Sequence, residues 1–169
     1  NALSAEMIAE LTAFALTMAA ADAPRAVVLS GAGDVFCAGA DLEWMKAQID
    51  ANRETRIREA TKLAVMLKAL NEMPVPLIGR IHGSALGGGV GLACVCDVVV
   101  AASDTKFGLT ETRLGLIPAT IGPYVVARMG EGAARRVFMS ARTFDAAEAR
   151  DLGLVARVVT LPDLAPAIE

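Results

Sequence analysis

The sequence predicts a single α/β domain, and three observations support this fold class. Short apolar runs of strand length alternate with longer segments of helical periodicity. The run DVVVAA (97–102) is apolar after its first residue, which is typical of a parallel strand in a sheet covered on both faces. The length of 169 residues suits one domain with a sizeable core. We therefore expect parallel strands joined by right-handed helical crossovers.

The first expected element is an amphipathic helix over residues 7–20. Ser4 can cap its start, and Leu3 and Ile8 can form a hydrophobic staple across the cap. The segment carries Glu10 and is too short to cross a membrane. Its apolar stripe is expected to consist of Met7, Leu11, Phe14 and Met18.

The other elements follow from local signals. Asp41 can cap a short helix, and Gly153 can end the last one. In chain order we expect a strand at 25–31, helices at 41–48 and 54–71, a strand at 74–83, a helix at 86–96, a strand at 97–102, helices at 132–141 and 145–153, and a strand at 154–159. The apolar stripe of the 54–71 helix is expected to be Ile57, Ala60, Leu63, Ala64, Leu67 and Leu70.

Composition narrows the function classes. The formal net charge is −3 and there is no basic stripe, which argues against nucleic acid as a main partner. Hydrophobic residues make up 54% of the chain, which indicates deep burial or contact with partner subunits. The three cysteines, Cys37, Cys94 and Cys96, form no CxxC pair, so we expect buried reduced thiols rather than a disulfide or metal site.

A glycine triplet, Gly87 to Gly89, lies between a strand-like and a helix-like segment. Free backbone N–H groups at a helix start can hold a phosphate or an oxygen that becomes negative during a reaction. The dinucleotide fingerprint fails because position 92 is Leu, and no Gly-Lys-Ser/Thr follows as in a P-loop. Taken alone, the triplet is better explained by close packing of helix on strand.

A second glycine loop, GAGDVFCAGADLEWM (31–45), also follows a strand and precedes a helix. Three segments in order, VFCAGADLEWMK, HGSALGGGVGLACVCDVVVAA and KFGLTETRLGLIPA, resemble the crotonase, or enoyl-CoA hydratase/isomerase, superfamily. The resemblance continues to AEARDLGLVARVV near the end and so covers nearly the whole chain. It implies a ClpP/crotonase-like spiral of ββα units and an acyl-coenzyme A thioester as ligand.

The resemblance also implies a domain organisation. Residues 1–169 are expected to form a single crotonase core domain that is shortened at both ends relative to the family. The N-terminal hairpin and the C-terminal helical extension of family members are absent from this sequence. The family assembles as homotrimers or dimers of trimers, so a homo-oligomer is expected. We expect a cytoplasmic location, or the mitochondrial matrix in a eukaryote, with neither a membrane nor a nucleic acid as partner.

Residue by residue, the resemblance implies an oxyanion hole made by the backbone N–H groups of Ala40 and Gly88. Two fixed donors would hold the thioester oxygen when it gains charge, and backbone donors need no particular protonation state. Coenzyme A is expected to contact Ala38, Asp41 and Leu42, and Trp44 beside this segment can line the pocket. Coenzyme A arrives as part of the substrate, so no cofactor and no metal are expected.

The acid–base groups should then be carboxylates, and family hydratases commonly have two. The first of the two positions is Gly91 here, so that carboxylate is lost. The second is Glu111, in FGLTETRLG, which we expect to act as general acid and base. The alternative without the motif is an exposed glutamate paired with Arg113.

Three functions remain open on this sequence. The first is a hydratase that adds water to a 2-enoyl-CoA through a stabilised enolate. The second is an isomerase that moves the double bond with Glu111 alone, and the third is a weakly catalytic CoA-binding subunit, which Gly91 would explain. A hydrolase based on His82 and Ser84 is disfavoured because GxSxG is absent and no orienting acid is evident.

The segment GLIPATIGPYVVARMG, together with GGGVGL, resembles the methylglutaconyl-CoA and carboxygeranoyl-CoA hydratases. These act on branched acyl chains with a second carboxylate, as in leucine or isoprenoid breakdown. Arg113 or Arg128 could then bind the distal carboxylate, although either could equally be a surface residue.

Overall fold

Two sheets organise the computed structural model, which describes residues 1–20 and 22–169. The larger sheet is parallel throughout and runs in the order β1 (Val27–Ser30), β2 (Leu77–Ile81), β4 (Val98–Ala102) and β7 (Arg157–Val159). The smaller sheet contains β3 (Ser84–Leu86), β5 (Lys106–Gly108) and β6 (Thr143–Asp145), with β3 parallel and β6 antiparallel to β5.

From β2 to β5, successive strands alternate between the two sheets, which confirms the expected spiral of ββα units. β2 in the larger sheet leads into β3 in the smaller one and then into α4 (Gly88–Val95). β4 leads in the same way into β5, the 3-10 helix η1 (Glu111–Leu114) and α5 (Gly122–Met129). After β1, a single bridge between Cys37 and Ala85 replaces the second strand, and α2 (Leu42–Asp50) and α3 (Arg53–Asn71) follow.

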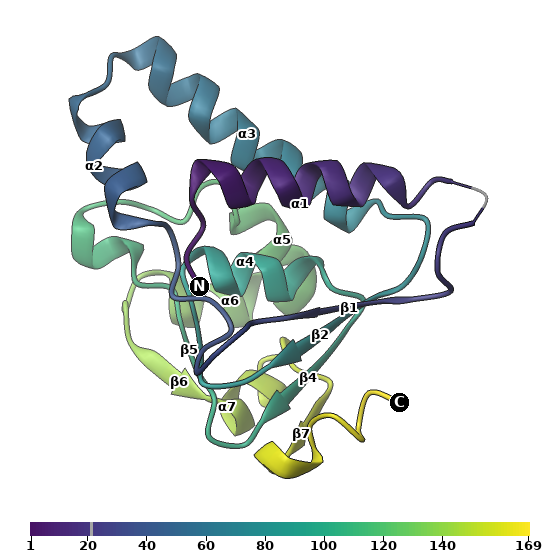
Figure 1. The fold of residues 1–169 in the computed structure, drawn as a ribbon. Helices are drawn as coiled ribbons and strands as arrows, with labels where there is room; N and C mark the ends of the chain where they lie inside the picture. The colour runs from purple at the N-terminus through teal and green to yellow at the C-terminus, as the bar shows by residue number, and fades with distance from the viewer. Residues whose placement is uncertain (21) are drawn as a thin grey trace.

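The helices cover the larger sheet in layers. Figure 1 shows α1 (Ala5–Thr17) and α3 on one side of the molecule, with α4 between them and the strands. α5, α6 (Glu131–Phe138) and α7 (Ala146–Asp151) follow, and the chain ends after β7 and the 3-10 helix η2 (Leu161–Asp163). The largest fully buried side chains of the core include Phe107, Met66, Leu67, Ile81 and Val90.

The helix caps agree with the sequence, but the buried face of α1 differs from the prediction. Ser4 accepts a hydrogen bond from the Met7 amide at 3.2 Å and caps α1. Leu3 and Ile8 are both buried in the core, as the staple requires. Phe14, predicted on the apolar stripe, is 42% exposed because the buried face instead contains Ile8 and Ala15.

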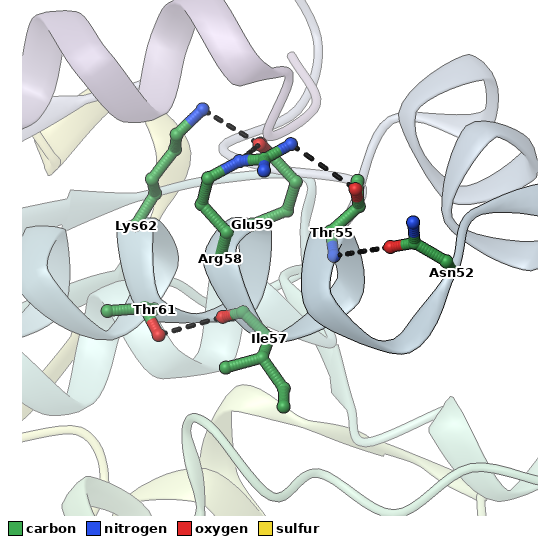
Figure 2. A network of polar contacts seen from close by, with 7 residues as sticks. All are labelled: Asn52, Thr55, Ile57, Arg58, Glu59, Thr61 and Lys62. Atoms are coloured by element: carbon green, nitrogen blue, oxygen red, sulfur yellow. Dashed lines mark hydrogen bonds and ion pairs between the residues drawn. The ribbon is translucent and has the colours of Figure 1, made fainter.

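The apolar stripe predicted for α3 is confirmed only in the C-terminal half of the helix. Leu67 and Leu70 are buried, together with Met66, whereas Ile57 is 50% exposed. Figure 2 shows the polar surface of the N-terminal half, where Asn52 caps the helix and Glu59 contacts Lys62 and Arg58. This half projects beyond α1 and the sheet in Figure 1, so there is less core for it to pack against.

Six elements of the described residues were not predicted: β3, β5, β6, α5, η1 and η2. The three strands have three residues each, too few to show a period of two.

All three cysteines are free and buried, as predicted. Among the described residues, no helix combines the length and apolar character needed to cross a bilayer.

Candidate active site

A cavity of about 730 Å³ lies between α2 and α3 on one side and the two glycine loops and η1 on the other. Its lining includes six residues that the sequence singled out as site residues: Ala38, Ala40, Leu42, Trp44, Gly88 and Glu111. The segments that carry them are far apart in the sequence, so the fold itself assembles this set.

Backbone pairing brings the two glycine loops together. The Cys37 amide donates to the Ser84 carbonyl at 3.0 Å, and the Leu86 amide donates to the Cys37 carbonyl at 2.9 Å. This ties the first loop to β3, the strand that ends just before Gly87. The Leu3 amide then donates to the Gly39 carbonyl at 2.8 Å, so the chain near Ala40 is held from a second side.

The amides of Ala40 and Gly88 are left without protein acceptors. Among the described residues, neither N–H donates a hydrogen bond to the chain. Gly88 is the first residue of α4, where no preceding turn can supply a carbonyl and the helix dipole adds positive potential. Ala40 and Gly88 both line the same cavity, so an acceptor bound there has two unpaired amides nearby.

At each position of the triplet, a different steric constraint favours glycine. Gly87 has φ +49° and ψ −114°, a conformation that side chains rarely adopt. A Cβ on Gly88 would lie 2.5 Å from Cδ1 of Leu3, and one on Gly89 would lie 2.8 Å from the Cys37 carbonyl oxygen. The triplet therefore serves both the turn and the close approach of α4 to the first loop.

The Glu111 carboxylate lies directly over this glycine turn. A Cβ on Gly87 would be 3.3 Å from Oε1 of Glu111, which places the carboxylate beside the residue preceding Gly88. Its Oε2 atom is buried and has no hydrogen-bond partner among the described residues. Burial raises the pKa of the Glu111 carboxyl above its ordinary value, and a hydrogen bond from its own backbone opposes this only in part. No ion pair joins it to Arg113 within the described part of the chain.

A hydrophobic side chain fills the space beside Gly91, the residue at which the resemblance implies a carboxylate. A Cβ on Gly91 would lie 2.4 Å from Cγ2 of Ile121. Ile121 is 3% exposed and itself lines the cavity. The resemblance implies a carboxylate at the position of Gly91, and the packing shows that Ile121 occupies the space beside it.

Three sequence candidates do not reach the cavity. Asp41 accepts from the amides of Glu43 and Trp44 at 3.0 and 2.9 Å, so its carboxylate caps α2 and is absent from the lining. Arg128 donates to the carbonyls of Cys94 and Asp97 below α4 and is also absent. Arg113 follows Glu111 in η1 but does not line the cavity either.

His82 lies outside the cavity as well. Its Nε2 is 2.8 Å from the Gly33 carbonyl oxygen, so the ring connects the end of β2 to the first glycine loop. The sequence also missed four polar side chains that do line the cavity: Gln48, Arg56, Thr110 and Thr120. The one signal for Gln48 was its spacing of one helical turn from Trp44.

Comparison with known proteins places this geometry in a family. A family model described as enoyl-CoA hydratase/isomerase matches residues 1–167. A Thermus thermophilus protein whose name contains enoyl-CoA hydratase is 35% identical over 158 residues, which is 94% of this chain and 62% of that protein. Pseudomonas aeruginosa AtuE superposes with a TM-score of 0.95 at 39% identity, covering 99% of this chain and 65% of AtuE.

The enoyl-CoA hydratase of Mycobacterium smegmatis superposes with a TM-score of 0.93 at 35% identity, covering 99% of this chain and 64% of that structure. The chain thus spans less than two thirds of the length of each of these relatives. Because the family model matches almost every residue and the solved structures share the whole described fold, the chain belongs to the enoyl-CoA hydratase/isomerase family, a family of enzymes with the crotonase fold.

Proposed function

We propose that this chain carries the active site of an enoyl-CoA hydratase, which adds water to a 2-enoyl-CoA thioester. The observation that carries the proposal is one cavity lined by two backbone amides without protein acceptors, Ala40 and Gly88, and by one buried carboxylate, Glu111. Family membership supports the choice of thioester chemistry.

In this mechanism the thioester oxygen accepts hydrogen bonds from the Ala40 and Gly88 amides. Attack of water at the β-carbon moves electron density onto that oxygen and forms an enolate. Donors already fixed in place stabilise the charge without reorganising, and each is worth about 3–4 kcal/mol in comparable oxyanion holes. The tie between the first loop and β3 supports this role because it holds the two amides relative to each other.

Glu111 is proposed to remove a proton from the attacking water and to deliver a proton to the α-carbon. Its raised pKa supports both steps, because a carboxyl that titrates nearer neutral pH can both accept and return a proton. The hydroxyls of Thr110 and Thr120 line the same cavity and can hydrogen-bond the water.

A second candidate function is double-bond isomerisation. The observation that favours it is Ile121, which fills the space beside Gly91, where the resemblance implies the other carboxylate. The cavity lining contains Glu111 as its sole carboxylate among the described residues. One carboxylate is enough to move a proton between two carbons of an enolate. In hydration, the Glu111 carboxylate must also activate the attacking water.

For the acyl group, we propose a branched chain with a second carboxylate, as in the methylglutaconyl-CoA and carboxygeranoyl-CoA hydratases. The motif GLIPATIGPYVVARMG supports this choice. Arg128 is not a candidate for binding the distal carboxylate, because its guanidinium donates to backbone carbonyls outside the cavity.

A substrate panel with Glu111→Gln tests the function. Hydration is followed as loss of enoyl thioester absorbance with crotonyl-CoA and methylglutaconyl-CoA, and isomerisation as conversion of a 3-enoyl to a 2-enoyl thioester. We expect hydration by the wild type and a loss of at least about 100-fold in kcat for Glu111→Gln, as for removal of a general acid–base group. Glu131→Gln, on the exposed surface of α6, is the matched control and should be unchanged.

Each alternative has its own outcome. Turnover of the 3-enoyl substrate alone would identify an isomerase. Binding of CoA thioesters without turnover, unchanged in Glu111→Gln, would leave a binding subunit and end the proposal.

A further inference from the structure

One wall of the cavity carries polar side chains that the proposed chemistry does not use. Trp44 and Gln48 come from α2 and Arg56 from α3. Their neighbours on the same wall, such as Ile49 and Leu63, are apolar. The polar groups are therefore specific features of an otherwise hydrophobic surface.

Two of these side chains have buried atoms with no partner. Nε1 of Trp44 and Oε1 of Gln48 make no hydrogen bond within the described residues, although both atoms are buried. The two residues are four apart on α2 and so share one face of the helix. Because buried polar atoms are nearly always hydrogen-bonded, a pair of unpartnered ones beside a cavity calls for a partner from outside the chain.

Arg56 adds positive charge to the same wall. Its Nη2 donates to the Ile49 carbonyl at 2.6 Å, which holds the guanidinium at the end of α2. No carboxylate pairs with Arg56 in the described part of the chain. A guanidinium has five N–H donors, so most remain available to an acceptor.

Gln48 and the guanidinium of Arg56, which contacts Ile49, lie away from the oxyanion site along α2, and Trp44 lies one turn closer to it. The helix starts at Leu42, two residues after Ala40, and Gln48 lies six residues further on. At the rise of an α-helix this is about 9 Å along the axis. An acyl chain anchored by its thioester oxygen at Ala40 and Gly88 would bring its far end, not its reacting carbons, to Trp44, Gln48 and Arg56.

We propose that Trp44, Gln48 and Arg56 form a subsite for a carboxylate at the far end of the acyl chain. The inference rests on the proposed function for the position of the thioester. The Trp44 indole N–H and the Arg56 guanidinium donate to the carboxylate, and Gln48 donates through its amide after rotation of the side chain, which exchanges its oxygen and nitrogen. A neutral hydroxyl could satisfy Trp44 and Gln48, but the charge of Arg56 favours an anion.

Binding of unreactive saturated thioesters tests this subsite separately from turnover. Calorimetry compares glutaryl-, adipoyl- and suberoyl-CoA with pentanoyl-, hexanoyl- and octanoyl-CoA on the full chain. We expect at least one carboxylate-ended thioester to bind about tenfold more tightly than its methyl-ended partner, because hydrogen bonds to a charged group are stronger than neutral ones, while the partial solvation of Arg56 limits the gain.

Substitutions test whether the preference for carboxylate-ended thioesters arises from the cavity wall formed by α2 and α3. Arg56→Met should remove most of the preference for carboxylate-ended thioesters and change the binding of methyl-ended thioesters far less. Trp44→Phe, which removes the N–H donor together with the pyrrole ring, should reduce the preference severalfold. Arg58→Met is the matched control, because Figure 2 shows Arg58 directed to Glu59 and Thr55 on the outer surface of α3.

Two results would overturn the subsite. One is equal affinity of the wild type for both series at every chain length. The other is an equal loss of affinity for carboxylate-ended and methyl-ended thioesters in Arg56→Met. Either can occur in an enzyme that hydrates crotonyl-CoA normally, so failure of the subsite is distinct from failure of the proposed function. Binding of no thioester at all would end both.

Discussion

The Glu111 carboxyl combines burial with an unpartnered oxygen, and this has a consequence for stability as well as for catalysis. Burial raises its pKa in the folded protein. A carboxyl with a raised folded pKa favours the folded state while it is protonated, and this contribution is lost as the pH rises through the folded pKa. Ionised Glu111 therefore destabilises the protein at neutral pH.

We predict that Glu111→Gln, while inactive, is more stable than the wild type at neutral pH. The difference in Tm between variant and wild type should grow as the pH rises above the ordinary pKa of a glutamate, about 4.3, and level off above the raised pKa of the folded protein, because only the wild-type side chain ionises. Thermal unfolding followed by circular dichroism at several pH values measures it. Glu59→Gln should show the opposite trend, because the Lys62 hydrogen bond lowers the Glu59 pKa and stabilises its ionised form.

The residues of the site differ in how far the sequence predicts them. Ala40, Gly88 and Glu111 lie in motifs, and the structure brings all three to one cavity. Ile121 could not be predicted, because its role depends on contact with Gly91 across α4 and α5. Arg56 was missed for a similar reason: a charged residue on a surface helix looks solvated until the fold places a cavity beside it.

At the level of elements, the start of α4 and the first glycine loop form one packed unit. Gly89 faces the Cys37 carbonyl, which accepts the hydrogen bond from Leu86. We predict that Gly89→Ala lowers the free energy of unfolding by about 1–3 kcal/mol, as overpacking does, and lowers kcat as the loop that carries Ala40 moves. Urea unfolding and the enoyl absorbance assay measure the two effects.

Gly132→Ala on α6 is the control for that change. Nothing lies within 4 Å of a Cβ at Gly132, and its φ is not in the left-handed region. It should be neutral or stabilising by up to about 1 kcal/mol, since alanine favours helix. Unchanged stability and activity in Gly89→Ala would mean that the two segments are not tightly coupled.

Elements could be predicted where the sequence carries a local capping residue or a long continuous pattern. The caps at Ser4 and Asp41 and the buried strand β4 were correct because each depends on local chemistry or on a continuous apolar run. The stripe of α3 was half wrong because periodicity shows that a helix is amphipathic, not where the core ends. The second strand of each ββα unit was missed because three residues pair only after the first strands are in place.

At the level of the whole molecule, labelling of the three cysteines can test whether the buried core unfolds as one unit. Cys37, Cys94 and Cys96 belong to the same buried cluster although they lie on two different segments. Burial raises the pKa of Cys94 and of Cys96 to about 12 and also raises that of Cys37. The reactive thiolate is therefore scarce in the folded protein at neutral pH, and reagent access is blocked as well.

We predict that a disulfide reagent labels none of the three thiols rapidly in the native protein and all three in denaturant. Under native conditions they should label at one common rate, because each needs global unfolding, which fewer than about one molecule in a thousand has undergone at any moment. Mass spectrometry of labelled peptides resolves the three rates, and Met139→Cys, at a residue 75% exposed, supplies a rapidly labelled control. Faster labelling of Cys37 alone would show that the segment leading to Ala40 opens independently of the core, and the proposed oxyanion site would then be formed by a mobile loop on a stable scaffold.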